Sequence, residues 1–68
     1  MDLDALKAFL AVAEHGSFLK AADELYRSRT TLRRQVEALE ARAGTDLFER
    51  RRSGVTLTAA GQALRERG

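Results

Sequence analysis

The chain has 68 residues, no Cys, a single His and a formal net charge of +2. This length fits one small domain, and the absence of Cys excludes a disulfide framework and a thiolate metal site. No apolar run approaches the ~20 residues needed to cross a bilayer, and no signal-peptide pattern opens the chain, so we expect a soluble, cytoplasmic protein.

Charge is unevenly distributed along the sequence. Residues 1–26 carry two Lys against five acidic residues, a net charge of −3, whereas residues 27–68 carry ten Arg against five acidic residues, a net charge of +5. All basic residues of the second part are Arg, whose guanidinium suits bidentate contacts with phosphate and guanine. The asymmetry favours a nucleic acid partner over an ordinary solvated charged face.

The beginning of the sequence predicts two helices. Apolar residues at helical spacing over 3–13 indicate the first, with Asp2 as its N-cap and Gly16 following its last residue. Ser17 is expected to cap a second helix, whose apolar face lies within residues 18–25.

A third helix is predicted within residues 28–43. Ser28 is a suitable N-cap, and Gly44 can adopt the left-handed conformation that ends a helix. One narrow apolar stripe at helical spacing defines its buried side: Leu32, Val36, Leu39 and Ala43. Because only two residues separate it from the preceding helix, the two helices must cross steeply, as in a helix-turn-helix.

The first turns of this third helix show three Arg side chains to solvent. Arg29 and Arg33 lie on the shoulder of the apolar stripe, and Arg34 points away from it. Cations near a helix N-terminus lower helix stability, since that end is already electropositive. A polyanion outside the helix is therefore expected to favour them.

After Gly44 the apolar period changes. Residues 47–50 and 55–57 are predicted strands, joined by a loop over 51–54 that ends in Gly. The tip of this hairpin is expected to project Arg51 and Arg52 beside the third helix.

Thr58 is a suitable N-cap for a last helix over residues 59–67. The predicted core of the whole domain consists of ten apolar side chains: Leu6, Phe9, Leu10, Phe18, Leu25, Leu32, Val36, Leu39, Phe48 and Leu57.

Several short motifs carry a resemblance to a known family: Leu6-x-x-Phe9, Gly16-Ser17-Phe18-x-x-Ala21-Ala22-x-x-Leu25, Ser28-x-x-x-Leu32-x-Arg34-Gln35-Val36, Leu39-Glu40, Gly44, Leu47-Phe48-Glu49-Arg50 and Gly54-Val55-x-Leu57-Thr58-x-Ala60-Gly61. Their order and spacing over nearly all 68 residues resemble the N-terminal winged helix-turn-helix domain of the LysR-type transcriptional regulators. The expected fold is mainly α, with a three-helix core, a two-stranded β wing and the start of a fourth linker helix. Residues 1–58 would form the DNA-binding domain, and residues 59–68 the start of a truncated linker and dimerisation helix.

The resemblance implies sequence-specific binding of double-stranded promoter DNA by a bacterial regulator. The third helix would lie in the major groove, and the wing would contact the backbone or the minor groove. An intact regulator would form a homodimer or tetramer and would bind a small-molecule effector through a domain absent from this chain. We expect the 68-residue chain itself to be monomeric or weakly dimeric, because the last helix offers little apolar surface beyond its first turn. No cofactor, metal or membrane partner is expected.

The sequence departs from the family where DNA would be read. The family usually has Gln at the position of Arg29, Pro or Ser at Thr30, a small residue at Thr31 and Ser at Arg33. Arg27 stands where the family has an apolar turn residue, and Ala43 stands where the family frequently has Leu. The Arg34-Gln35 pair is retained.

Ten residues are candidates for DNA contact: Ser17, Arg27, Ser28, Arg29, Thr30, Thr31, Arg33, Arg34, Arg51 and Arg52. Some have alternatives that the sequence leaves open. Arg27 could merely lay its stem over Leu25, Arg33 could pair with Glu37 four residues on, and Arg29 could bind either guanine or phosphate.

Two other classes of function fit the sequence less well. One His, no Cys and scattered carboxylates offer no catalytic triad, metal cluster or phosphate loop, so an enzyme is not expected. The remaining alternative is a winged-helix protein-interaction module whose third helix docks an acidic protein. Its outward face would then be apolar or aromatic, whereas the face predicted here is polar.

Overall fold

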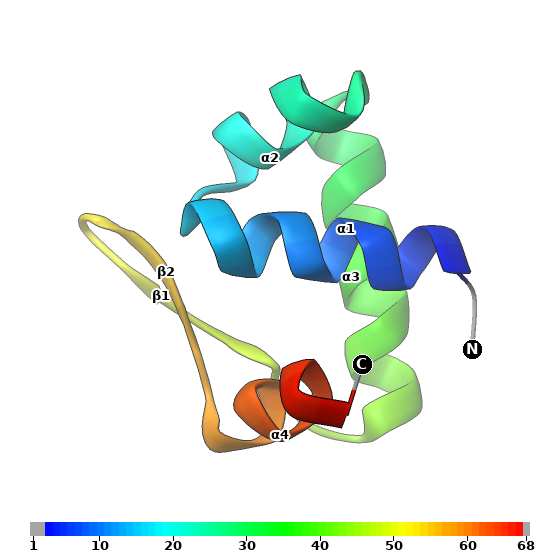
Figure 1. Ribbon diagram of the computed structural model, residues 1–68, viewed down its shortest axis with the longest axis vertical. Helices are drawn as coiled ribbons and strands as arrows, with labels where there is room; N and C mark the ends of the chain where they lie inside the picture. The colour runs from blue at the N-terminus through cyan, green and yellow to red at the C-terminus, as the bar shows by residue number, and fades with distance from the viewer. Residues whose placement is uncertain (1–2, 68) are drawn as a thin grey trace.

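The structure is a computed structural model and describes residues 3–67. Within that range the chain forms, in order, α1 (Leu3–His15), α2 (Phe18–Leu25), α3 (Arg29–Ala43), β1 (Phe48–Arg51), β2 (Gly54–Leu57) and α4 (Ala59–Arg67). Figure 1 shows α1 crossing in front of α3, with α2 near one end of α3, α4 near the other, and the hairpin projecting to one side. The predicted winged helix-turn-helix architecture is confirmed.

Side-chain caps begin three of the helices, as predicted. The Ser17 hydroxyl accepts a hydrogen bond from Lys20 N at 3.2 Å, and the Ser28 hydroxyl accepts one from Thr31 N at 3.1 Å. Thr58 caps α4 by accepting from the backbone N–H of Gly61 at 3.1 Å. Each bond satisfies a backbone donor that has no partner within its helix. The predicted Asp2 cap lies outside the described residues.

Helix α3 ends at Gly44, which adopts the left-handed conformation with φ 73° and donates its N–H to Glu40 O at 2.9 Å. The turn between α2 and α3 also uses this conformation, although its residue is Tyr26, with φ 55°. Arg27 N donates to Ala22 O at 3.0 Å, which closes the end of α2. The link between α2 and α3, residues 26–28, is therefore a tight, hydrogen-bonded turn.

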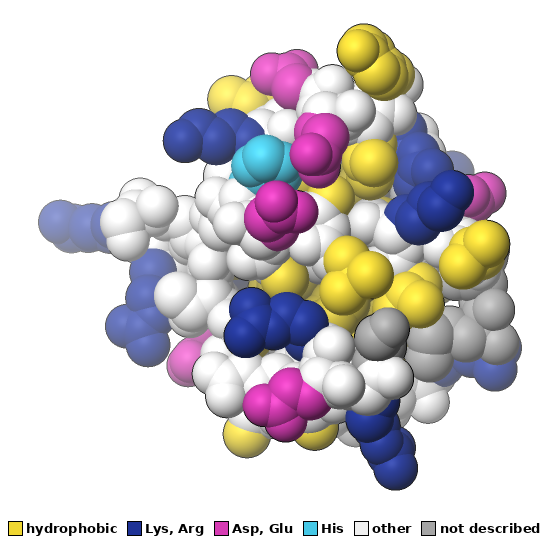
Figure 2. All heavy atoms as spheres, viewed as in Figure 1, with side chains coloured by type: hydrophobic (Ala, Val, Ile, Leu, Met, Phe, Trp, Pro, Cys, Tyr) yellow, Lys and Arg dark blue, Asp and Glu magenta, His cyan; other side chains and the backbone are white. Residues whose placement is uncertain are grey.

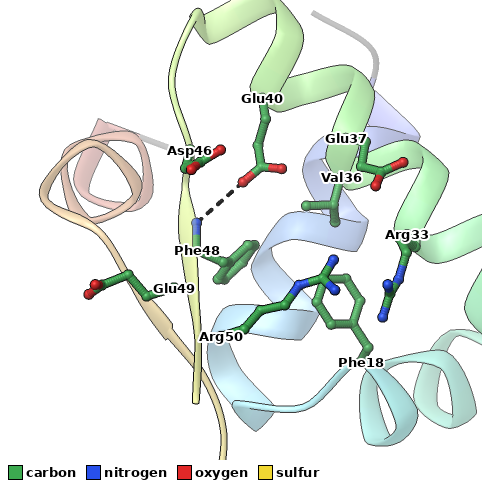
Figure 3. A pocket seen from close by; sticks show the side chains of 9 residues that line it. All are labelled: Phe18, Arg33, Val36, Glu37, Glu40, Asp46, Phe48, Glu49 and Arg50. Carbon is green, nitrogen blue, oxygen red and sulfur yellow. Dashed lines mark hydrogen bonds between the residues drawn. The ribbon is translucent and has the colours of Figure 1, made fainter.

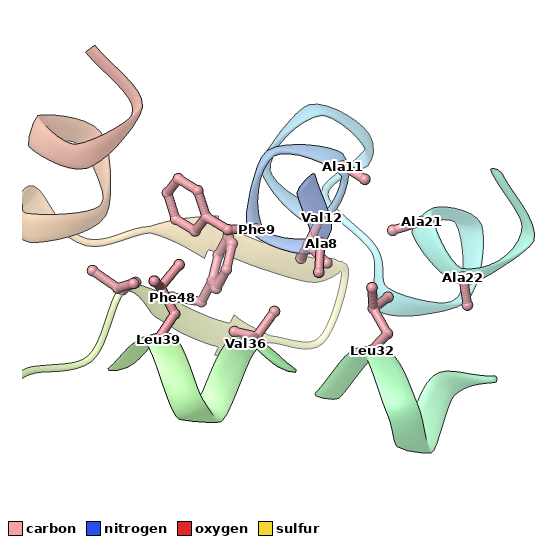
Figure 4. Close-up of a cluster of buried hydrophobic side chains, with 11 residues drawn as sticks. Ala8, Phe9, Ala11, Val12, Ala21, Ala22, Leu32, Val36, Leu39 and Phe48 are labelled. Atoms are coloured by element: carbon pink, nitrogen blue, oxygen red, sulfur yellow. The ribbon is translucent and has the colours of Figure 1, made fainter. Parts of the chain in front are cut away.

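The core lies where α1, α3 and the hairpin meet (Figure 4). Phe9 and Phe48 pack with ring centroids 5.3 Å apart, and Phe18 packs edge-on against Phe48 at 6.1 Å. Small side chains, Ala8 on α1 and Ala21 on α2, are completely buried and let the helices approach closely.

The predicted core is confirmed for its centre and needs correction at its edges. Five of the ten expected side chains are buried: Phe9, Leu32, Val36, Leu39 and Phe48. The other five are partly buried and pack against them: Leu6, Leu10, Phe18, Leu25 and Leu57. Val12 and Leu47 are fully buried but were not expected to be. Ala43, expected on the buried stripe, is exposed and lines a hollow between α3 and α4.

The predicted strand bounds need correction, although the observed pairing of Arg50 with Val55 is the one that the predicted loop over 51–54 implies. The antiparallel ladder pairs Phe48 with Leu57 and Arg51 with Gly54, so the turn consists of two residues instead of the predicted four. Leu47 does not join the strand, because its N–H donates to the Glu40 carboxylate at 2.8 Å. Thr56 is exposed while its neighbours on β2 are half-buried, as expected for alternating strand residues.

Glycine allows the wing to lie against the helices. Gly54 has φ 136°, and a Cβ there would come 2.3 Å from the carbonyl oxygen of Gly16. The next residue, Val55, donates its N–H to that same oxygen at 3.0 Å. The base of the wing is thereby fixed to the link between α1 and α2.

Candidate nucleic-acid interface

The outward face of α3 presents a group of basic and hydroxyl side chains. Arg29, Thr30, Arg33 and Arg34 are all exposed and line one shallow hollow together with Glu37. Within residues 3–67, none of these three Arg side chains forms an ion pair with a carboxylate. The sequence prediction of an exposed basic face is thus confirmed, and its charges remain free for an external anion.

The N-terminal end of α3 carries two hydroxyls that bond to each other. Besides accepting from Thr31 N, the Ser28 hydroxyl donates to the Thr31 hydroxyl at 2.9 Å. Both side chains are exposed. Their hydrogen atoms can reorient toward a phosphate oxygen without breaking the cap, since the cap uses Ser28 only as an acceptor.

The α2 N-terminus lies at the start of the same helix-turn-helix. Ser17, the fourth hydroxyl candidate, is half-buried and holds its side chain on Lys20 N. Like Ser28, it places the positive end of a helix dipole at the surface.

Arg27 is the predicted site residue whose geometry differs most from the others. Its guanidinium donates to Gln35 Oε1 at 2.9 Å and to the Asp4 carbonyl at 3.3 Å, and lies 3.5 Å from the Asp4 carboxylate. The side chain is only 23% exposed. These contacts link the α2–α3 turn to α1 and α3, a structural role different from the stem packing that the sequence left open.

The wing divides its three consecutive Arg residues between two faces. Arg51 bonds to the Thr56 hydroxyl at 3.3 Å and pairs with Glu49 at 3.6 Å, so it belongs to the outer face. Arg52 occupies the exposed two-residue turn. Arg50 shares the inner face with Phe48 and points toward α3 (Figure 3).

Arg50 is a residue of this region that the sequence prediction missed, because only Arg51 and Arg52 at the hairpin tip were expected beside the third helix. Side chains alternate between the two faces of a strand, so Phe48 and Arg50 lie on the same face. Arg50 lies within the predicted strand 47–50, so this alternation was the signal that could have identified it.

A hollow of about 460 Å³ separates α3 from β1, with Arg33 and Arg50 on its rim and Phe18 between them (Figure 3). The Arg33 guanidinium carbon lies 5.4 Å from the Phe18 ring centroid, and that of Arg50 lies 6.0 Å from it. Glu40, on the wall of the hollow, bonds to Leu47 N and Phe48 N and so positions the wing against α3.

Acidic side chains also line this region: Glu37 shares the hollow on α3, and Glu40, Asp46 and Glu49 line the hollow beside β1. Figure 2 shows acidic groups around the single His on the face of α1 and α2, whereas Lys and Arg side chains lie mainly toward the margins and at the wing. Among residues 3–67, no group of three or more His, Asp or Glu side chains is arranged to hold a metal ion. No helix in the described range is long and apolar enough to cross a membrane.

A family model and individual relatives both match this chain, and they indicate the same family. The model of the bacterial regulatory helix-turn-helix proteins of the lysR family matches residues 3–62. The transcriptional regulator TfdT of Cupriavidus pinatubonensis is 50% identical over 64 residues, and TcbR of a Pseudomonas species is 47% identical over 66 residues. These matches cover 94% and 97% of the chain but only 28% and 22% of the two relatives, so the chain spans about a quarter of their length.

Solved structures match over almost the whole chain. The CbnR DNA-binding domain in its complex with DNA is 46% identical, with a TM-score of 0.93, and the match covers 98% of this chain and 77% of that one. The BenM DNA-binding domain bound to catB site 1 DNA is 39% identical, with a TM-score of 0.92 and coverages of 98% and 75%.

Proposed function

The chain belongs to the LysR family of bacterial regulatory helix-turn-helix proteins, and we propose that it binds double-stranded promoter DNA with sequence specificity. One observation carries the proposal: the exposed face of α3 presents Arg29, Arg33 and Arg34 without a carboxylate partner in the described residues. Such a face is complementary to the edges and phosphates of a major groove. The similar domains of CbnR and BenM were solved as DNA complexes, which supports the same partner here.

In this proposal α3 enters the major groove with its N-terminal half. Arg29 and Thr30 reach base edges, Arg34 anchors a phosphate, and the hydroxyls of Ser28 and Thr31 contact the backbone at the helix entry. Ser17 offers a further backbone contact from the start of α2. The protein binds rather than catalyses, in keeping with the regulators to which it is similar.

The wing supplies the second set of contacts. Arg51 and Arg52 are exposed and can reach phosphates or the minor groove beside the helix-turn-helix. Arg27 is assigned a smaller direct share, because its donors are already used by Gln35 and Asp4. It supports the angle of α3 and adds at most a peripheral phosphate contact.

For the whole regulator we propose a cytoplasmic homodimer or tetramer in which α4 continues as a linker helix. Residues 1–58 then act as the DNA-binding domain, and residues 59–68 begin the linker. A small-molecule effector would act through a further domain, as the shorter span of this chain relative to its relatives suggests.

A salt titration tests the function directly. Binding of a fluorescent duplex to the 68-residue chain is measured by anisotropy at several salt concentrations, for the parent, Arg34→Gln and Arg42→Gln. Arg42 serves as the matched control, since it makes the same charge change at the far end of α3. The parent should show a linear fall of log K with log salt, and Arg34→Gln should reduce that slope by about one unit.

Arg42→Gln should leave the slope near the parent value. Failure of the parent to bind any duplex at low salt would overturn the proposal. Tight, salt-dependent binding to an acidic protein under those conditions would then favour a protein-docking module instead.

A further inference from the structure

The pair formed by Arg33 and Arg50 is unusual for two cations of a folded protein. They come from different elements, α3 and β1, yet both guanidinium groups lie against the ring of Phe18, at 5.4 and 6.0 Å from its centroid. An aromatic face attracts a cation and limits its movement. The ring therefore holds two flexible side chains at the opening between the recognition helix and the wing (Figure 3).

The carboxylates around the hollow do not neutralise this pair. Glu40 directs its oxygen to the backbone N–H groups of Leu47 and Phe48, and Glu49 pairs with Arg51 on the other face of the hairpin. Neither the Arg33 nor the Arg50 side chain forms an ion pair or a hydrogen bond within residues 3–67. Two like charges held beside one ring repel each other, and an external anion between or beside them relieves that repulsion.

Glu37 could have neutralised Arg33, since it lies one turn further along α3. The Arg33 side chain instead extends toward Phe18, away from Glu37 (Figure 3). A pair with Arg preceding Glu has the poorer orientation on a helix, which explains why the ring is preferred.

We propose that Arg33, Arg50 and Phe18 form a phosphate clamp that grips the DNA backbone between the recognition helix and the wing. The proposal rests on the DNA-binding function above and adds a site to it. Phosphates recur regularly along each DNA strand, so two guanidinium groups held at one opening are suited to contact phosphates of the same backbone. Each Arg forms charge-assisted hydrogen bonds with phosphate oxygens.

The clamp assigns Phe18 a positioning role. Its ring orders the two Arg side chains before DNA arrives, which lowers the entropy lost on binding. Arg33 then acts chiefly through the backbone, whereas Arg29 is left to read bases. The clamp also gives the wing a second contact, on the inner face of β1, independent of Arg51 and Arg52.

The experiment compares Arg33→Gln, Arg50→Gln, the double variant, Phe18→Leu and the control Arg42→Gln. Each 68-residue variant is checked for parent-like folding by circular dichroism and is then titrated with two duplexes of unrelated sequence over a range of salt. Arg33→Gln and Arg50→Gln should each lower the slope of log K against log salt by about one unit on both duplexes. The double variant should lower it by about two.

Phe18→Leu should weaken binding to both duplexes by about two- to ten-fold while leaving the salt slope unchanged, because it removes the ordering and keeps the phosphate contacts. If Phe18→Leu is unfolded, Arg33→Gln and Arg50→Gln still test the clamp. Both Arg side chains are exposed, so replacing them should not unfold the domain. Arg42→Gln should keep the parent slope.

Two results would overturn the clamp. One is a slope for Arg50→Gln equal to that of Arg42→Gln. The other is an Arg33→Gln variant whose loss is confined to one of the duplexes, which would make Arg33 a base reader. If the parent binds DNA and Arg34→Gln lowers the salt slope, either result rejects the clamp and leaves the proposed DNA-binding function standing. If the parent binds neither duplex, the proposed function fails as well.

Discussion

Tyr26 shows how a single residue can be placed against its backbone preference. It has φ 55°, the only positive φ among the non-glycine residues of 3–67, and 96% of its surface is exposed. The left-handed conformation costs a residue with a Cβ about 1–2 kcal/mol, and Asn tolerates it better than most. Because the side chain is almost entirely in solvent, little packing offsets this cost.

We therefore predict that Tyr26→Asn stabilises the domain. The free energy of unfolding should rise by about 1 kcal/mol, which corresponds to about 4–8 °C in melting temperature for a domain of this size. Thermal unfolding followed by circular dichroism measures the change. Tyr26→Ala is the matched control, since Ala lacks the short polar side chain that eases the left-handed conformation for Asn and should gain much less. Equal stabilities of the two variants would contradict the strain argument.

The contacts of the Arg27 side chain could not be predicted from the sequence. Its exposure in a turn and its charge pointed to DNA, while its actual partners, Asp4 and Gln35, lie on two other helices. Contacts of this kind depend on the angles at which the helices cross. Packing of the whole core sets those angles, so they cannot be predicted from a local sequence pattern.

At the scale of elements, α3 was the most predictable because several signals agree. Its N-cap, its apolar period and its terminal Gly all specify the same bounds, and the observed helix is Arg29–Ala43. The stripe formed by Leu32, Val36 and Leu39 is buried as expected. Its exposed face could consequently be predicted correctly as well.

Leu39→Ala tests the contribution of that stripe. Leu39 is 2% exposed, so truncation should lower the free energy of unfolding by about 2–5 kcal/mol, comparable to the total stability of a small domain. Urea unfolding measures it. Leu3→Ala provides the contrast, because Leu3 is 65% exposed and should lose far less. A Leu39→Ala variant with a transition at the parent midpoint would show the core to be assigned wrongly.

The wing was predictable as a hairpin, but its strand bounds were not. Tertiary contacts set them: Leu47 N donates to the Glu40 carboxylate, and Gly54 lies against Gly16. Arg50 lay within the predicted strand, on the same face as Phe48. It was missed because only the residues at the hairpin tip were expected beside α3.

Gly61→Ala tests how closely α4 packs on the strand entry. A Cβ at this position would lie 2.2 Å from the carbonyl oxygen of Leu47, a backbone atom that cannot move aside readily. Although Ala normally favours a helix over Gly, this clash should lower stability by about 1–3 kcal/mol. Gln62→Ala, on the exposed side of α4, should be neutral or slightly stabilising. A melting temperature of Gly61→Ala above that of the parent would refute the close approach of Gly61 to the Leu47 carbonyl.

For the whole molecule, family resemblance and charge distribution predicted the architecture and the basic face of α3. The family match over residues 3–62 and the structural similarity to DNA-binding domains agree with that prediction. The individual DNA contacts remain predictions, since each depends on how the domain docks. Because Arg29 and Arg33 differ from the residues usual in the family, we predict that the family's base preferences at these two positions do not carry over to this chain.

Arg29 is the residue of α3 that we expect to read the DNA sequence. Arg29 opens α3 directly after the Ser28 cap, where recognition helices bring side chains to base edges. Arg pairs bidentately with guanine O6 and N7, whereas the Gln usual in the family pairs with adenine. A phosphate contact at this position would instead add affinity without sequence information.

Selection of bound sequences from a randomised duplex pool, run in parallel for the parent and Arg29→Gln, tests this claim most directly. The parent should enrich a motif containing one guanine that Arg29→Gln relaxes or switches, with a loss of about 1–3 kcal/mol at that base pair alone. Other positions of the motif should be unchanged. A parent that enriches no motif, or an Arg29→Gln variant that weakens all sequences alike, would contradict sequence reading by α3.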